Sequence, residues 1–156
     1  PGNDDDGREL QAKLAQEKLR TDMLNSARFL KAHPLSTGKL GATGFCWGGG
    51  TTNYLAIALG ADLQAAAPFY GAAAETASVP KIKAPLLIHL AENDDFINVL
   101  QPAFEAAMKA ARVRFEVHTY PGTQHGFHND STPRYDEAAA RLAWERTVAF
   151  FRKHLA

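Results

Sequence analysis

The single cysteine of this chain, Cys46, lies within the glycine-rich stretch GFCWGGG at residues 44–50. Residues 39–43 before it predict a short strand, and residues 51–59 after it predict a helix. A glycine two residues to either side of a nucleophile at such a turn is typical of a nucleophile elbow. Because the turn is tight, we expect a Cβ to clash at both Gly44 and Gly48. The pattern favours a nucleophilic thiol over the buried, inert thiol that a lone cysteine commonly is.

Phosphate and dinucleotide loops are the other glycine-rich sites that could follow a strand. The stretch lacks the Gly-Lys-Ser/Thr ending of a phosphate-binding loop and the G-x-G-x-x-G spacing of a dinucleotide-binding turn. We therefore exclude both, and expect no cofactor.

Two further strand ends carry groups that a cysteine nucleophile needs. Asp94 and Asp95 follow the apolar strand predicted at residues 85–90, and His125 follows the alternating strand predicted at residues 114–120. A thiol needs a base to take its proton, and the base needs a carboxylate to hold its tautomer. The chain order of nucleophile, acid and histidine is that of an α/β-hydrolase triad, with either aspartate as the acid. The backbone N–H of Trp47, at the start of the following helix, is a candidate oxyanion donor.

The predicted elements that position these groups alternate between helix and strand. Helices are expected at residues 8–32, 51–59, 99–111 and 133–155, with Asp6 capping the first, and a further strand at residues 64–70. Residues 72–84 are expected to be a loop. This order predicts a three-layer α/β/α domain with a mostly parallel sheet.

Composition limits the classes of partner. The 156 residues, 46% of them hydrophobic, are expected to form one domain over residues 1–156. Seventeen basic and seventeen acidic residues give a formal charge of zero, so nucleic acid and anionic membranes are not expected partners. The sequence has no apolar run long enough to cross a bilayer and no zinc-type Cys/His spacing, so no metal is expected. One unpaired cysteine favours a reducing, cytoplasmic compartment.

Four stretches together resemble the dienelactone hydrolase family of α/β-hydrolases. They are GFCWGGG, AENDDFI, YPGTQHGFHND and RYDEAAARLAWERTVAFF, and the resemblance spans nearly the whole chain. It implies hydrolysis of carboxylic esters or lactones, with Cys46 as nucleophile, His125 as base and Asp94 as acid. Ala91 departs from the family pattern, because a glycine is usual three residues before the acid.

The substrate pocket is assigned to Tyr70, Phe127 and Asn129. Family members that hydrolyse dienelactone resemble one another in carrying an arginine at the position of Asn129, so the resemblance implies a short ester or another lactone as substrate. His89 is expected to be a satisfied core histidine and His128 a rim residue, while the other histidines are expected to be structural.

The resemblance begins partway through the family fold, so we expect a partial α/β-hydrolase fold that lacks the N-terminal strands. One edge of the strand that leads to Cys46 would then be open, which predicts a homodimer or a complementary N-terminal chain. A catalytically silent fragment that binds a partner chain is the alternative function. A redox sensor would need a resolving cysteine, which the sequence does not contain.

Overall fold

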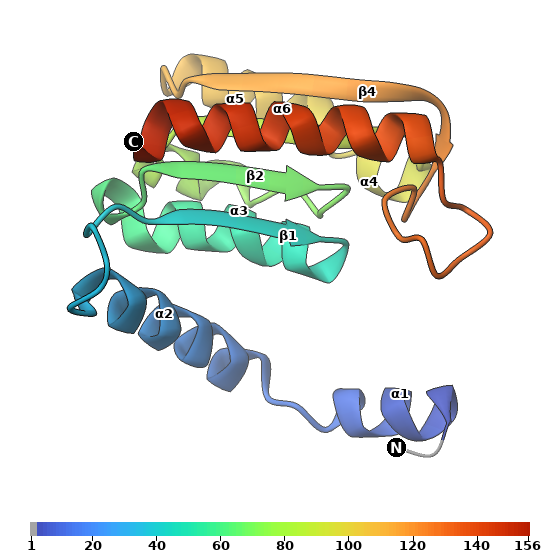
Figure 1. Ribbon diagram of the computed structural model, residues 1–156, viewed down its shortest axis with the longest axis horizontal. Coiled ribbons are helices and arrows are strands. Elements are labelled where there is room, and N and C mark those ends of the chain that lie inside the picture. Colours follow the sequence, from blue (N-terminus) through green and yellow to red (C-terminus); the bar gives the residue numbers. More distant parts are fainter. Residues whose placement is uncertain (1–2) are drawn as a thin grey trace.

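The computed structural model describes residues 3–156 and shows a four-stranded parallel sheet between two helical layers (Figure 1). The strands lie side by side in chain order and are β1 (Gly41–Phe45), β2 (Ala65–Phe69), β3 (Leu86–Asn93) and β4 (Phe115–Gln124). The helices are α1 (Asp4–Ala12), α2 (Gln16–Ala32), α3 (Trp47–Leu59), α4 (Asp95–Asn98), α5 (Gln101–Ala110) and α6 (Glu137–Leu155). The predicted α/β fold class is confirmed.

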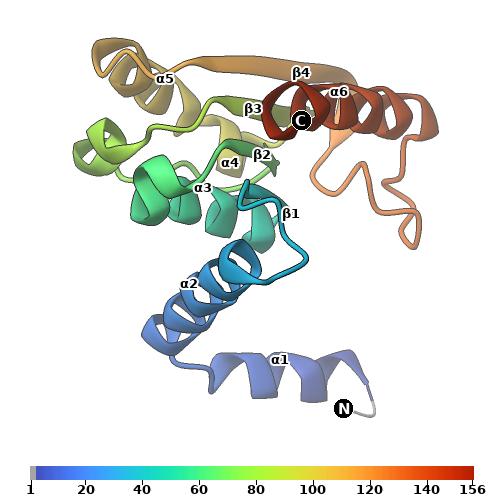
Figure 2. The ribbon, with the colours of Figure 1, turned by 60° about the vertical axis from the view of Figure 1, so that its left-hand side comes forward.

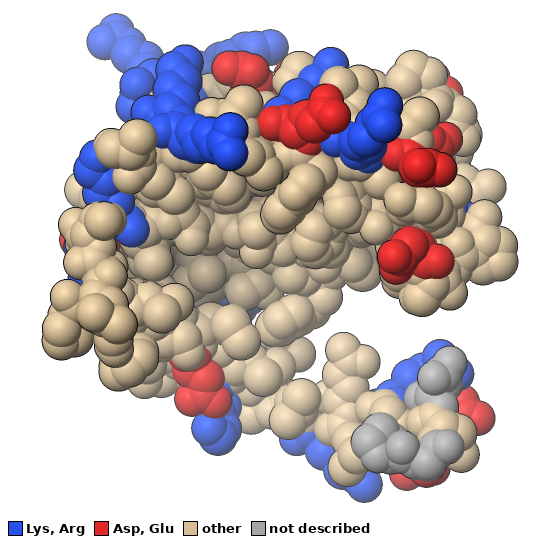
Figure 3. Space-filling view, in the orientation of Figure 1, with Lys and Arg blue, Asp and Glu red and all other residues tan. Residues whose placement is uncertain are grey.

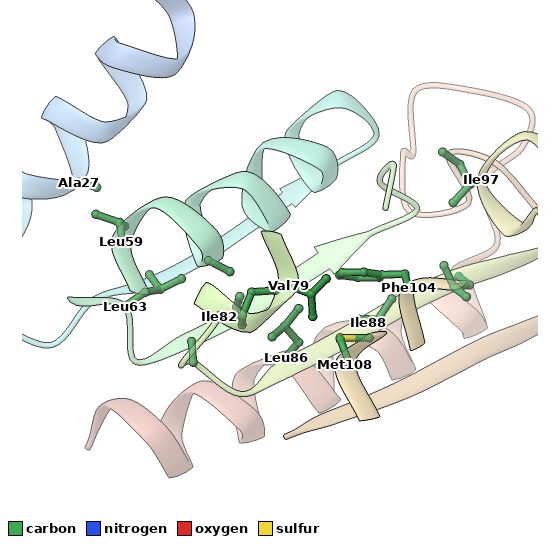
Figure 4. Packing of buried hydrophobic residues seen from close by; sticks show 14 residues of the cluster. Ala27, Leu59, Leu63, Val79, Ile82, Leu86, Ile88, Ile97, Phe104 and Met108 are labelled. Carbon is green, nitrogen blue, oxygen red and sulfur yellow. The ribbon is translucent and has the colours of Figure 1, made fainter. Parts of the chain in front are cut away.

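The inner strands β2 and β3 are buried on both faces, which explains why they read as continuous apolar runs. Helices α3 and α5 cover one face and α6 covers the other (Figure 2). On the α3 and α5 face, Leu86 and Ile88 of β3 pack with Phe104 and Met108 of α5 (Figure 4). On the α6 face, residues of β2 and β3 pack against Phe150. Alternate residues of β2 and β3 therefore enter the two halves of the core.

The first predicted helix is wrong as a single element, because the structure has two helices with a break at residues 13–15. The N-cap of α1 is Asn3, whose side chain accepts a hydrogen bond from the Asp6 backbone, so Asp6 is not the cap. Ala15 has extended backbone angles before α2 begins. Leu10 and Leu14 are about half exposed, so their side chains gain little packing energy from a continuous helix across residues 13–15.

Other boundaries shift in ways that matter for the site. Helix α3 begins at Trp47, directly after Cys46, four residues earlier than predicted. Strands β3 and β4 continue to Asn93 and Gln124, which places Asp94 and His125 immediately beyond them. Residues expected to form only a loop contain a short 3₁₀ helix at Thr76–Lys81. The last helix begins after Asp136, whose carboxylate accepts from the Ala139 backbone N–H and so caps it.

Strand β1 forms one edge of the sheet. In the part of the chain that the structure describes it pairs only with β2, and α2 packs on α3. Phe45 at its end is 39% exposed. Figure 3 shows a largely uncharged surface between the charged upper rim of the molecule and the N-terminal helices.

Across residues 3–156 no helix combines the length and apolar character that a membrane crossing requires. The same residues contain no cluster of three or more histidine, cysteine or acidic side chains suited to a metal ion.

Candidate active site

Cys46 occupies a strained turn between β1 and α3. Its backbone angles are φ 55° and ψ −117°, outside the regions that non-glycine residues ordinarily adopt. The turn is held by a hydrogen bond from the Cys46 N–H to the Phe69 carbonyl, at 3.1 Å. A Cβ added to Gly44 would lie 2.2 Å from the Gly48 carbonyl oxygen, so this position requires glycine. The thiol is exposed at the end of the sheet where all four strands finish.

The expected clash at Gly48 is wrong. A Cβ built there meets nothing within 4 Å, because the tight approach is between the Gly44 α-carbon and the backbone of Gly48. A second close approach was missed, between Gly49 and Gly71. A Cβ on Gly49 would lie 2.5 Å from the Phe69 carbonyl oxygen, and one on Gly71 would lie 2.2 Å from the Gly49 carbonyl carbon. These glycines let the start of α3 rest directly on the backbone after β2.

His125 and Asp94 form a short hydrogen bond at this same edge. The distance from His125 Nδ1 to Asp94 Oδ2 is 2.6 Å, which is short even for a charge-assisted N–H···O bond. The Asp94 side chain is only 6% exposed, whereas the imidazole is 30% exposed. Because a carboxylate accepts, Nδ1 carries the proton, which leaves the Nε2 lone pair free to accept a proton. Asp95 is exposed in the first turn of α4, and the carboxylate that reaches His125 is that of Asp94.

Tyr70 lies next to this pair and has a strained backbone of its own, with φ 35°. Its ring centroid is 5.0 Å from that of His125 and 5.4 Å from that of Phe127. Burial raises the pKa of Tyr70 to about 12, against a hydrogen bond from the His128 backbone that favours the phenolate. The neighbouring Cys46 raises the same pKa. Tyr70 therefore keeps its proton at neutral pH, and its ring lies beside that of His125.

The predicted pocket residues differ in how much surface they offer. Phe127 is fully buried behind Tyr70, so it has no surface for a substrate, and Tyr70 itself is only 2% exposed. Asn129 is exposed, but its Oδ1 accepts hydrogen bonds from the Ser131 backbone and hydroxyl. Arg134 curls back beside Gly126, with guanidinium atoms 3.8 Å from the position that a Cβ would take there.

The Cys46 thiol makes no hydrogen bond within the described residues. Catalytic contacts of this kind are often long without substrate and tighten in the complex. The Trp47 backbone N–H is in the first turn of α3, where amide groups have no intrahelical acceptor.

His89 is the satisfied core histidine that the sequence predicts. Its Nδ1 is 2.9 Å from the Tyr120 hydroxyl and its Nε2 is 2.9 Å from the Thr147 hydroxyl, with the ring stacked on Phe69 at 4.2 Å. Thr147 donates to the Ala143 carbonyl, so it must accept from His89 Nε2. Burial lowers the pKa of His89 to about 3, which keeps the imidazole neutral.

His128 is more enclosed than a rim residue. Its ring centroid is 5.0 Å from that of Phe45 and 6.0 Å from that of Trp144, so it bridges β1 and α6. Its Nε2 is buried and has no hydrogen-bond partner in the described chain. Burial lowers its pKa, and the nearby Asp130 opposes this only in part. Sequence spacing alone does not reveal this contact, because it joins residues 45, 128 and 144.

The other histidines lie outside this arrangement. His33 accepts from the Leu35 backbone, His118 lies 3.8 Å from Glu116, and the His154 ring packs edge-on against Phe150.

A family model and individual proteins that are similar to this chain point to the same family. The model of the dienelactone hydrolase family matches residues 3–155. "Protein usf" of Aquifex pyrophilus is 35% identical over 142 residues, which cover 88% of this chain and 59% of that protein. A "Putative carboxymethylenebutenolidase" of Saccharolobus solfataricus is 31% identical over 145 residues, covering 92% of this chain and 55% of that protein.

A solved structure agrees with these relatives. The "Putative Dienelactone Hydrolase from Klebsiella pneumoniae subsp. pneumoniae MGH 78578" superposes with a TM-score of 0.80 at 26% identity, covering 90% of this chain and 63% of that one. The chain thus spans less than two thirds of the length of each of these relatives. Because the family model matches residues 3–155 of this chain, the chain belongs to the dienelactone hydrolase family.

Proposed function

We propose that this protein hydrolyses carboxylic esters or lactones with Cys46 as the nucleophile. The observation that carries the proposal is the 2.6 Å bond between His125 and Asp94 at the sheet edge where the strained turn exposes Cys46. Family membership and relatives whose name is carboxymethylenebutenolidase support this class of substrate.

The first half of the reaction forms a thioester. His125 Nε2 takes the proton from the Cys46 thiol, and Asp94 stabilises the imidazolium through Nδ1. The thiolate attacks the carbonyl carbon, and the backbone N–H of Trp47 donates to the developing oxyanion. As the tetrahedral intermediate collapses, the C–O bond to the leaving group breaks and His125 returns the proton to the departing oxygen.

The second half releases the acid. Water gives a proton to His125 and attacks the thioester carbon, and the C–S bond then breaks to release the carboxylic acid and regenerate the thiol. The Tyr70 ring lies beside His125, and its hydroxyl stays protonated because burial raises its pKa to about 12.

The proposal extends to the open edge of the sheet. Among residues 3–156 no strand pairs with the outer edge of β1, which lies next to the partly exposed ring of Phe45 and is a template for another strand. We assign this edge to a homodimer contact or to a complementary chain. We also place the protein in the reducing cytoplasm, because its nucleophile must remain a free thiol.

Two other functions receive less support. A catalytically silent fragment does not explain why His125 and Asp94 form a 2.6 Å hydrogen bond at the sheet edge that exposes the thiol. The family match does not favour this alternative either. A thiol sensor lacks a second cysteine in the sequence.

The experiment is turnover of p-nitrophenyl acetate by Cys46→Ala and His125→Ala, with His33→Ala as the control histidine. We expect both site variants to lose at least about a thousandfold in kcat/KM while keeping the thermal midpoint of the parent protein. His33→Ala should retain full activity. Retention of activity by folded Cys46→Ala would contradict the proposal.

A further inference from the structure

A cavity lies on the α6 side of the loop that carries His125. It has a volume of about 470 Å³ and lies between residues 128–137 and the first turns of α6. Figure 1 shows this loop projecting at the sheet edge where the strands end. The cavity does not include Cys46, Asp94 or His125, so nothing in the triad accounts for it.

The cavity adjoins the proposed nucleophile through one pair of rings. His128 forms part of its wall and packs against Phe45, the residue directly before Cys46. The Phe45 and Trp144 rings lie on two sides of His128, at 5.0 and 6.0 Å. The cavity therefore adjoins, through His128, the residue that directly precedes Cys46.

The aromatic part of the wall has free surface. Trp144 is 46% exposed and Tyr135 is 40% exposed, and both line the cavity. Large aromatic faces that stay accessible inside a concave site are suited to an apolar or cationic group, because the ring face carries negative electrostatic potential.

The charges around the cavity favour a cation. Asp130 and Glu137 line it, and neither forms a salt bridge within residues 3–156. Arg141 is the one basic side chain of the lining, and it lies 3.8 Å from Glu145. Arg134 is turned towards Gly126 and does not line the cavity. Because burial lowers the pKa of His128, that ring adds no positive charge at neutral pH.

We propose that this cavity accepts a cationic ammonium group at the non-reacting end of the ester that Cys46 attacks. The inference rests on the proposed esterase function and names the class of its substrate. Trp144 and Tyr135 supply the faces for a cation–π contact, and Asp130 and Glu137 supply the compensating negative charge.

The kinetic test compares a choline ester with its neutral carbon isostere, the 3,3-dimethylbutyl ester of the same acid. These substrates differ in charge and hardly in shape. We expect kcat/KM to favour the choline ester by about tenfold, the size of a partly desolvated cation–π contact. Trp144→Ala, and separately the double change Asp130→Asn with Glu137→Gln, should bring the ratio close to one.

Leu142→Ala is the matched control for Trp144→Ala. Leu142 lies on the same helix and is 43% exposed, but it does not line the cavity, so its removal should leave the ratio unchanged. The double charge change keeps the size of both side chains, so it tests the inference even if Trp144→Ala does not fold. A wild-type ratio of one or less, or a ratio that none of the cavity variants changes, would overturn it.

A binding measurement separates this inference from the proposed function. In Cys46→Ala protein, tetramethylammonium should shift the Trp144 indole N–H resonance and leave that of Trp47 in place. If this shift occurs but no ester is hydrolysed, the cavity is right and the esterase proposal is wrong. If esters are hydrolysed in a Cys46-dependent way but tetramethylammonium causes no shift, the cavity inference alone is wrong.

Discussion

Replacing Asp94 with asparagine removes the group that fixes the His125 tautomer and hardly changes the shape of the site. Asp94 Oδ2 lies 2.6 Å from His125 Nδ1, and the Asp94 side chain is 6% exposed. In the variant, an amide NH₂ facing Nδ1 can donate only if the ring proton moves to Nε2. The nitrogen that should receive the thiol proton would then already carry one.

The expected loss is large because both consequences affect the transition state. The equivalent change in a serine protease triad lowers kcat by roughly 10⁴, which corresponds to about 5 kcal/mol of activation free energy. A thiol is more acidic than a serine hydroxyl and depends less on the base, so we expect a loss of roughly 10³ to 10⁴.

The assay is steady-state hydrolysis of p-nitrophenyl acetate, with thermal unfolding to show that the variant is folded. Asp95→Asn is the matched control, because it makes the same chemical change one residue along, in an exposed side chain. It should remain within about twofold of the parent, as expected of a surface change away from the reacting groups. A large loss in Asp95→Asn with little loss in Asp94→Asn would refute the assignment of the acid.

Three further predictions follow from the packing. Gly44→Ala places a Cβ 2.2 Å from the Gly48 carbonyl oxygen, so in chemical denaturation it should lower the unfolding free energy by about 3 kcal/mol or more. Gly48→Ala is its control, because a Cβ there meets open space, and it should be neutral or stabilising. Thr147→Val removes the acceptor of the buried His89 Nε2–H and should cost about 1–3 kcal/mol in the same assay; an unchanged midpoint would contradict the assigned tautomer. His89 has a pKa of about 3 when folded, so the unfolded chain alone binds its proton between about pH 6.5 and pH 3. Its contribution to the unfolding free energy should therefore fall by about 1.4 kcal/mol for each pH unit below 6.5, and its NMR signals should not titrate above pH 4.

The parts of the site that depend on local pattern could be predicted from the sequence. The glycine spacing around Cys46, including Gly44, indicates a tight turn after a strand, which places Cys46 at a strand end. The apolar run at residues 85–90 indicates a buried strand, and the polar residues after it place Asp94 at its end. Parallel strands end at one edge, which is why His125 could be expected near Asp94 before any distance was known. Local spacing did not distinguish Asp94 from Asp95, because burial decides which of them faces the histidine.

The errors come from contacts between distant residues. The role of Phe127 depends on its packing behind Tyr70 and Tyr120, which no local pattern reveals. Gly49 and Gly71 meet only when α3 lies on the end of β2, so their close approach could not be inferred from either segment alone. The break at residues 13–15 was missed because helical spacing continues across it, while the helices on either side expose their apolar residues.

Mass spectrometry of the protein quenched in acid during turnover of p-nitrophenyl acetate tests the central claim most directly. The account predicts a mass increase of one acetyl group, located by peptide mapping to Cys46 and absent from Cys46→Ala. In His125→Ala protein the adduct should form much more slowly, because no base takes the thiol proton. Full turnover with no adduct on Cys46, or an adduct on another residue in folded, active protein, would contradict a cysteine nucleophile.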